Sequence, residues 1–227
     1  MPLSSPSGPQ GPGLEAKAEF VLRLRARGIR DLGVLRAMEA VPRDAFGPHR
    51  YADLANKDVA LPLPCGQTMA EPFVVARMME ALGPTPSCRV LEIGAGSGYV
   101  TALLARLGGE VLAVERFRSL VVYAKTRLAA LGVANAAVVW GDGLAVPPDA
   151  GPFDRILVHA EMSEIPDCLA ALLGEGGAIV FARPGRPGES RPQYLVRAAR
   201  VPEGGWAEVP VAPSRLRPLI DGPSRGL

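Results

Sequence analysis

The chain has 227 residues, of which 48% are hydrophobic and 21% are charged, so it can bury the core of one α/β domain of ordinary size. Its formal net charge is +2 and it has no dense run of Lys or Arg, which argues against nucleic-acid and membrane-surface binding. The three cysteines are scattered without a CxxC pair and only two histidines are present, which argues against a disulfide framework or a zinc site.

The N-terminal segment 1–13 is rich in Pro, Gly and Ser, and it is expected to be a disordered tail. It has no basic stretch followed by an apolar one, as a secretory signal would have. No apolar run approaches the roughly 20 residues that a membrane helix needs. We therefore expect a cytoplasmic protein with reduced thiols and without a membrane partner.

Residues 14–83 are predicted to form an N-terminal region of helices and a substrate loop. Apolar residues recur at helical spacing over 14–28, 32–41 and 71–83. Asp31 is placed to cap the second of these helices, and Pro72 lies in the first turn of the third. The segment 47–68, which contains several prolines, is predicted to be irregular.

The segment from residue 84 to residue 220 alternates short apolar runs with helical patterns. The predicted strands cover 88–93, 110–115, 136–140, 153–160 and 176–184, with helices over 99–107, 119–132 and 164–173. Such alternation with short connections indicates parallel βαβ units. The predicted fold class is therefore α/β, with a Rossmann-like, doubly wound, mostly parallel sheet and an N-terminal helical cap.

The last part of the chain is predicted to close the sheet. The Pro- and Gly-rich segment 183–193 is expected to be a mobile loop. Apolar runs at 194–200, 206–211 and 215–220 are candidate closing strands, and 221–227 is expected to be a tail. With its two tails, the chain is predicted to form a single domain.

The stretch EIGAGSGY (92–99) joins the first strand of the predicted core to its helix. Gly94, Gly96 and Gly98 give a GxGxG spacing, which lets the backbone turn sharply and approach a ligand closely. Ligands of open α/β sheets bind beyond the carboxyl ends of the strands, near the point where the strand order reverses. The turn is therefore the predicted ligand site.

Carboxylates accompany this turn. Glu92 precedes it, Glu115 ends the next strand about 20 residues further on, where a carboxylate accepts ribose hydroxyls, and Asp142 follows the third strand. A plain strand-to-helix turn would explain the glycines alone, and a dinucleotide such as NAD would need the helix N-terminus for its pyrophosphate. A positive sulfonium with an amino-acid tail favours carboxylates, so the pattern predicts S-adenosylmethionine as the cofactor. The predicted cofactor-binding residues are Glu92, Gly94, Gly96, Ser97, Gly98, Glu115, Asp142 and Gly143.

Further segments resemble the protein-L-isoaspartate O-methyltransferase family. VLRAMEAVPRDAF (34–46) resembles its "AM..VPR..F" segment, LPLPCGQTM (61–69) resembles its GQT loop, and the RPLI sequence at 217–220 resembles its closing "VPL". The resemblance covers about residues 20–220 and implies a class I methyltransferase fold. It also implies methyl transfer from S-adenosylmethionine to the α-carboxylate of isoaspartyl residues in proteins or peptides, as protein repair by a cytoplasmic monomer.

The GQT loop departs from the family at one position. The family's loop ends in a serine that is assigned to the substrate carboxylate, and this chain has Ala70 there. The loss of one hydroxyl donor to a charged acceptor costs roughly 1.5–3 kcal/mol. By resemblance the acceptor-side catalytic positions are Ala70, Thr68 and Gln67, and the last two or the backbone of 67–71 can take over the hydrogen bond.

Two alternatives therefore stay open: a methyltransferase of this fold with a different carboxylate or peptide acceptor, and a non-catalytic cofactor-binding protein. A nucleic-acid methyltransferase is disfavoured, because VHAEMSEIP (158–166) lacks an Asp/Asn-Pro-Pro-aromatic tetrad. Of the remaining polar residues, Arg43 is expected to shape a helix exit and His159 to be a hydrogen-bonded structural histidine.

Overall fold

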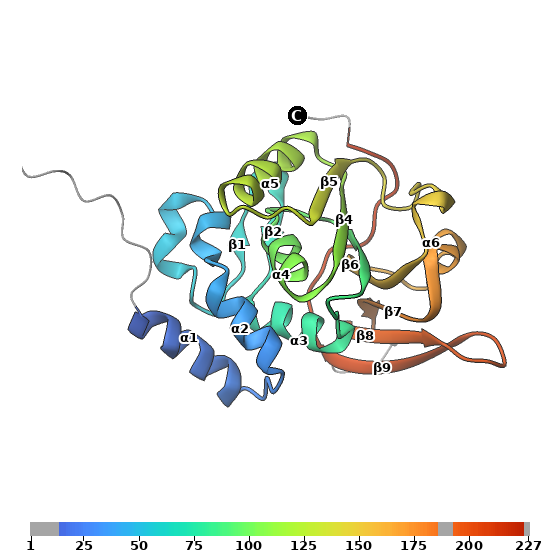
Figure 1. The fold of residues 1–227 in the computed structure, drawn as a ribbon, viewed down its shortest axis with the longest axis horizontal. Helices are drawn as coiled ribbons and strands as arrows, with labels where there is room; N and C mark the ends of the chain where they lie inside the picture. Colours follow the sequence, from blue (N-terminus) through green and yellow to red (C-terminus); the bar gives the residue numbers. More distant parts are fainter. Residues whose placement is uncertain (1–13, 186–192, 225–227) are drawn as a thin grey trace, which may run out of the picture.

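The computed structural model describes residues 14–185 and 193–224 (Figure 1). The tail predicted over 1–13, and the last residues of the tail predicted over 221–227, lie outside the described residues. The helices are α1 (Leu14–Ala26), α2 (Leu32–Ala40), α3 (Pro72–Leu82), α4 (Tyr99–Leu107), α5 (Arg118–Ala130) and α6 (Asp167–Leu172). The strands are β1 (Leu61–Pro62), β2 (Thr68–Met69), β3 (Arg89–Ile93), β4 (Glu110–Glu115), β5 (Ala136–Trp140), β6 (Phe153–Glu161), β7 (Leu173–Pro184), β8 (Gln193–Arg200) and β9 (Trp206–Pro213).

A seven-stranded sheet with the order β5-β4-β3-β6-β7-β8-β9 forms the centre of the molecule. The five strands from β5 to β7 are parallel, and β8 and β9 add as antiparallel strands at one edge. The chain starts the sheet at β3, builds outward to β5, and then returns to place β6 on the other side of β3. The strand order thus reverses between β3 and β6, and the predicted doubly wound, mostly parallel sheet is confirmed.

The two faces of the sheet bury two separate apolar clusters, because alternate strand residues point to opposite faces. In β3, Val90 packs under the layer of α1 to α5, whereas Leu91 and Ile93 face the cluster that includes α6. Figure 1 shows α1, α2, α4 and α5 on one side of the sheet and α6 on the other. The same alternation turns Glu92 toward α4, where it is a single carboxylate in an apolar layer.

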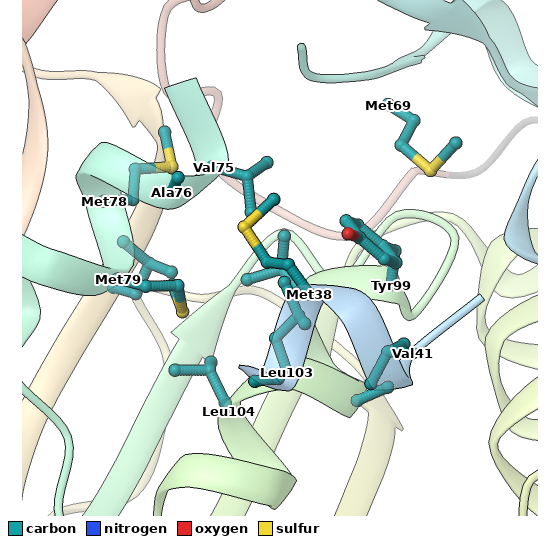
Figure 2. Close-up of a cluster of buried hydrophobic side chains, with 14 of the residues drawn as sticks. Met38, Val41, Met69, Val75, Ala76, Met78, Met79, Tyr99, Leu103 and Leu104 are labelled. Atoms are coloured by element: carbon teal, nitrogen blue, oxygen red, sulfur yellow. The ribbon is translucent and has the colours of Figure 1, made fainter. Parts of the chain in front are cut away.

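The predicted N-terminal helical cap packs on α4. Asp31 caps α2 by accepting a hydrogen bond from the Val34 backbone N–H at 2.9 Å. Figure 2 shows Met38 and Val41, at the end of α2, against Leu103 of α4, with side chains of α3 completing the cluster. This packing fixes where the chain leaves α2 and enters the GQT loop.

Two sequence predictions about irregular segments were wrong. The segment 47–68 contains 3₁₀ turns and a small hairpin, in which Leu61 pairs with Met69 and the Leu63 N–H donates to the Gln67 carbonyl at 2.8 Å. Part of the loop predicted over 183–193 is strand, since Pro184 pairs with Gln193. Residues 186–192 of that loop lie outside the described residues.

The third candidate closing strand, 215–220, is not a strand. It makes one isolated bridge, between Pro218 and Glu161 at the end of β6. The backbone of Glu161 donates to the Arg217 carbonyl at 2.8 Å and accepts from the Leu219 N–H at 2.9 Å. Glu161 is the last residue of β6, so the pairing does not extend beyond this bridge. We refer to residues 214–222 as the C-terminal strap. In the part of the chain that the structure describes, no helix is long and apolar enough to cross a membrane.

Candidate functional site

Two adjoining cavities lie at the carboxyl ends of β3, β4 and β6. The larger has a volume of about 370 Å³ and is lined by the Gly-rich turn, the GQT loop and the C-terminal strap. The smaller, of about 140 Å³, is lined by Glu115, Asp142 and the same strap. Gln67, Gly94, His159 and Arg217 line both cavities. The two cavities therefore meet at these four residues, which we call the junction.

The Gly-rich turn forms one wall of the larger cavity. Gly94 has φ +91°, and a Cβ there would lie 3.2 Å from the Cβ of His159. Gly96 also lines this cavity, whereas Gly98, at φ +85°, packs against Ala124 and lines neither cavity. Two of the three predicted glycines therefore face the site, and the third lets α4 pack on α5.

Glu115 ends β4 and lies on the wall of the smaller cavity. One carboxylate oxygen accepts from the Gly96 N–H at 2.9 Å, and the other accepts from the Phe117 N–H at 2.9 Å. Burial raises the pKa of Glu115, and these backbone hydrogen bonds oppose the shift. The carboxylate thus ties the Gly-rich turn to the end of β4 and keeps free lone pairs toward the cavity.

Asp142 and Gly143 follow β5 and also line the smaller cavity. The Asp142 carboxylate accepts from the Leu144 N–H at 2.9 Å and from the Gly222 N–H of the strap at 2.8 Å. It therefore fixes both its own turn and the strap. Gly143 is required by packing, because a Cβ there would lie 2.3 Å from Cγ2 of Ile93.

Gly143→Ala is expected to destabilise the fold by about 1–3 kcal/mol, the usual cost of overpacking a buried site. A thermal melt measures the effect. Gly141→Ala, in the same turn, is the matched control, because its Cβ would lie at an ordinary 3.7 Å from Val114 Cγ1. Equal melting temperatures for the two variants would contradict the packing argument.

Glu92 lies behind the cavity wall and contacts one residue of that wall, His159. It is completely buried and lines neither cavity among the described residues. One oxygen accepts from the Thr101 hydroxyl at 2.6 Å, and the other lies 2.9 Å from His159 Nε2. His159 itself lines both cavities. Glu92 was predicted among the cofactor-binding residues, and in the structure it contacts Thr101 and His159 behind the cavity wall.

The GQT loop forms the opposite wall of the larger cavity, and Gln67, Thr68 and Ala70 all line it. The Ala70 carbonyl accepts a hydrogen bond from Arg43 at 2.9 Å. The same guanidinium donates to the carbonyls of Ala55 at 2.7 Å and Val59 at 3.1 Å. Arg43 is only 2% exposed, and its burial lowers its pKa to about 10. This one buried side chain therefore links its own turn to the 55–59 segment and to the end of the GQT loop, instead of only shaping the helix exit.

Several residues of the larger cavity were missed by the sequence analysis. Tyr99 lines it from the start of α4, with a buried hydroxyl that has no hydrogen-bond partner among the described residues. Glu71 lines it from the start of α3, and Arg215 and Arg217 line it from the strap. The two strap arginines lie in a segment that was predicted to be a strand, and no sequence pattern indicated that they would line the site.

The arrangement suits an elongated ligand. Glu115 and Asp142 offer acceptors for sugar hydroxyls and an amino group at one end, and the Gly-rich backbone permits close approach at the other. This donor set fits S-adenosylmethionine. The described residues contain no group of three His, Cys, Asp or Glu side chains that could hold a metal ion.

Sequence comparisons find relatives in one family. The model described as Protein-L-isoaspartate(D-aspartate) O-methyltransferase matches residues 15–221. Protein-L-isoaspartate O-methyltransferase 2 of Rhodopseudomonas palustris (strain HaA2) is 48% identical over 211 residues, which cover 93% of this chain and 95% of the relative. The protein-L-isoaspartate O-methyltransferase of strain BisA53 is 46% identical over 227 residues and covers 100% of both chains.

Solved structures agree in fold. A protein-L-isoaspartate O-methyltransferase structure superposes with a TM-score of 0.73 at 27% identity, covering 89% of this chain and 65% of that one. A Plasmodium falciparum protein described as a protein-L-isoaspartate O-methyltransferase, in complex with S-adenosyl-L-homocysteine, gives a TM-score of 0.73 at 23% identity. It covers 90% of this chain and 98% of that one, and at this identity the likeness speaks for the fold.

Proposed function

This chain belongs to the protein-L-isoaspartate(D-aspartate) O-methyltransferase family, and we propose from that premise how its two cavities share the reaction. The protein is an S-adenosylmethionine-dependent carboxyl methyltransferase that acts on isoaspartyl residues in protein repair. The observation that carries our assignment of roles is the junction, where the smaller cavity, lined by Glu115 and Asp142, meets the larger cavity, lined by the GQT loop.

The smaller cavity binds the adenosine part of the cofactor in this proposal. Glu115 accepts hydrogen bonds from the ribose hydroxyls, and Asp142 with Gly143 borders the adenine. Gly94, Gly96 and Ser97 hold the methionine part, while Gly98 and Glu92 shape the turn from behind. When bound, S-adenosylmethionine supplies a methyl group on a positively charged sulfur. This division is supported by the positions of Glu115 and Asp142 on the cavity wall.

The larger cavity receives the isoaspartyl residue. A carboxylate with a pKa of about 3.9 is already ionised at neutral pH, so its oxygen needs no general base. Methyl transfer to an ionised carboxylate moves no proton, so the proposal gives His159, which lies 2.9 Å from Glu92, no acid–base role. The protein's task is to hold the carboxylate in line with the methyl group and exclude water, and orientation alone can contribute roughly 7–11 kcal/mol.

The test is methyl transfer from labelled S-adenosylmethionine to a short isoaspartyl peptide, with the aspartyl isomer as control. Product ester is scored as base-labile methanol, and a titration with S-adenosylhomocysteine verifies that the sample binds cofactor. Transfer to the isoaspartyl peptide alone is the expected result. Cofactor binding with transfer only to another carboxylate would favour the first alternative, and binding without any transfer would favour a non-catalytic role.

Ala70→Ser is expected to raise kcat/KM for the isoaspartyl peptide about tenfold, because it adds a hydroxyl donor on the acceptor wall. Ala70 is half-buried and lines the larger cavity. Ala60→Ser is the control, since Ala60 lines the same cavity at another point. Equal rates for wild type and both variants would argue that the end of the GQT loop does not contact the carboxylate.

We further propose that the enzyme works as a cytoplasmic monomer, with proteins and peptides but not nucleic acids as substrates. The net charge of +2 offers little attraction to phosphate. The three cysteines are free thiols, which is usual in a reducing compartment. Light scattering after gel filtration tests the oligomeric state.

A further inference from the structure

Of the two strap arginines that line the larger cavity, only Arg217 also lines the smaller one, and the family motifs do not account for an arginine at this position. The closing motif that the chain resembles is "VPL", and the corresponding residues here are Arg217, Pro218 and Leu219. Ala70 takes the place of a serine on the opposite wall. The serine hydroxyl at the end of the GQT loop is thus replaced by a methyl group, while two arginines of the strap, Arg215 and Arg217, line the larger cavity.

Arg217 is held at the junction by its backbone. Its carbonyl accepts from the Glu161 N–H at 2.8 Å, and the Leu219 N–H donates to the Glu161 carbonyl at 2.9 Å. These two hydrogen bonds attach the strap to the end of β6, two residues after His159. The position of the Arg217 Cα therefore does not depend on the GQT loop.

The junction is where methyl transfer must occur, because a carboxylate in the larger cavity can approach the cofactor only there. Of the four junction residues, Gly94 donates its N–H to the Val114 carbonyl, and His159 is bound to Glu92. Gln67 donates to the Cys65 carbonyl. The Arg217 guanidinium has no hydrogen bond or ion pair to another described residue. It is the junction side chain with free donors and a fixed positive charge.

A negative charge on the cavity wall is a second reason to expect a cation that binds the substrate carboxylate. Glu71 lines the larger cavity, and its carboxylate would repel an incoming substrate carboxylate. The buried Arg43 donates to backbone carbonyls of the loop, and its remaining nitrogen, Nε, has no partner among the described residues. Arg43 therefore raises the local potential but is itself 2% exposed, so it is not placed to touch the substrate.

We propose that Arg217 is the residue that binds the acceptor carboxylate in this enzyme, in the role that a serine of the GQT loop has in the family pattern. The proposal rests on the methyltransferase function stated above. The guanidinium donates to one carboxylate oxygen at the usual 2.7–2.9 Å of a charge-assisted hydrogen bond. The other oxygen attacks the methyl carbon, an O–C bond forms, the C–S bond breaks, and its electron pair stays on sulfur. No proton is transferred.

The experiment measures kcat and KM for the isoaspartyl peptide in wild type, Arg217→Ala, Arg217→Lys, Ala70→Ser and the Arg217→Ala/Ala70→Ser double variant. Arg217→Ala is expected to lower kcat/KM about 10- to 100-fold. Arg217→Lys keeps the charge but loses the planar, two-donor geometry of the guanidinium. Its kcat/KM is expected to lie between the values of wild type and Arg217→Ala. Ala70→Ser is expected to restore activity to Arg217→Ala, with a larger gain than in wild type, because serine then supplies the missing donor.

Three further measurements separate this role from a structural one. Affinity for S-adenosylhomocysteine is expected to change less than threefold in Arg217→Ala, which shows an intact cofactor site. Added guanidinium ion is expected to restore part of the activity of Arg217→Ala but not to accelerate wild type. Arg106→Ala removes the same charge from an exposed position on α4 that lines neither cavity, and it is expected to leave kcat/KM unchanged.

The proposal is overturned if Arg217→Ala keeps wild-type kcat/KM, or if its loss is restored neither by Ala70→Ser nor by guanidinium. A wild-type protein that transfers no methyl group to the isoaspartyl peptide would instead overturn the proposed function, and with it this role for Arg217. The two failures are therefore distinguished by the wild-type rate.

Discussion

Glu115→Ala is expected to weaken binding of S-adenosylhomocysteine at least a hundredfold. The substitution removes the acceptor for the Gly96 and Phe117 N–H groups, which hold the Gly-rich turn against β4. It also removes the proposed acceptor for the ribose hydroxyls. Each hydrogen bond to a charged group contributes about 1.5–3 kcal/mol, and a tenfold change in affinity corresponds to about 1.4 kcal/mol. Isothermal titration calorimetry measures the effect.

Glu110→Ala is the matched control, because Glu110 lies at the opposite end of the same strand. Its side chain is 74% exposed, and its ion pair with Arg89 is at the surface. We expect its affinity for S-adenosylhomocysteine to equal that of wild type. A Glu115→Ala protein that melts normally and binds the ligand within tenfold of wild type would refute the role of this carboxylate.

The pH dependence of binding gives a second readout for Glu115. An ordinary glutamate has a pKa of about 4.3. Burial raises the pKa of Glu115 above its ordinary value, so Glu115 takes up a proton at a higher pH than an ordinary glutamate does. The protonated carboxyl group accepts ribose hydrogen bonds less well than the carboxylate. Affinity for S-adenosylhomocysteine should therefore decline as the pH falls toward the raised pKa of Glu115. Glu115→Gln does not ionise, and its weaker affinity should be flat over the same pH range.

The core of the fold could be predicted because its signals are long and periodic. Five apolar strand segments with three intervening helices allow few topologies once crossovers must be short and right-handed. The hairpin of β1 and β2 was missed, since strands of two residues have no period to detect. Residues 215–220 of the strap were mistaken for a strand because they form a short, partly apolar run, although they pair with the sheet only at the end of β6.

For the candidate site, the sequence could predict which residues lie near the ligand but not what each of them contacts. Glu115, Asp142 and the glycines could be found because their positions follow from strand ends, which meet at one edge of a parallel sheet. What each does there depends on packing. Gly143 fits against Ile93, Gly98 fits against Ala124, and Glu92 turns toward α4 instead of the cavity. Such contacts join residues that are far apart in the sequence, and no local pattern encodes them.

Arg43 makes the long-range contacts that matter most for the acceptor wall. One guanidinium donates to the carbonyls of Ala55 and Val59, in the connection that precedes β1, and of Ala70, at the end of the GQT loop. Its desolvation works against the charged form, as its pKa of about 10 indicates. The three charge-assisted hydrogen bonds offset that cost and fix the loop that carries the acceptor wall.

Arg43→Met is expected to destabilise the protein by about 2–4 kcal/mol, because it leaves buried carbonyls without a donor. Methyl transfer to the isoaspartyl peptide should fall at least tenfold, since the GQT loop loses its anchor. Affinity for S-adenosylhomocysteine should change less than threefold, because strand ends and the strap form most of the smaller cavity and the GQT loop contributes Gln67. Denaturant unfolding, kinetics and calorimetry on the same preparation separate these effects.

Arg36→Met is the control for this substitution. Arg36 is exposed on α2, seven residues before Arg43, and we expect both its stability and its rate to match wild type. Arg43→Lys should be intermediate, because a single ammonium does not reach three carbonyls as a planar fork does. If Arg43→Met unfolds at the wild-type denaturant concentration, or loses cofactor affinity in parallel with activity, then this buried cation does not act through the acceptor loop. The division of the site into a strand-built cofactor half and a loop-built acceptor half would then have to be abandoned.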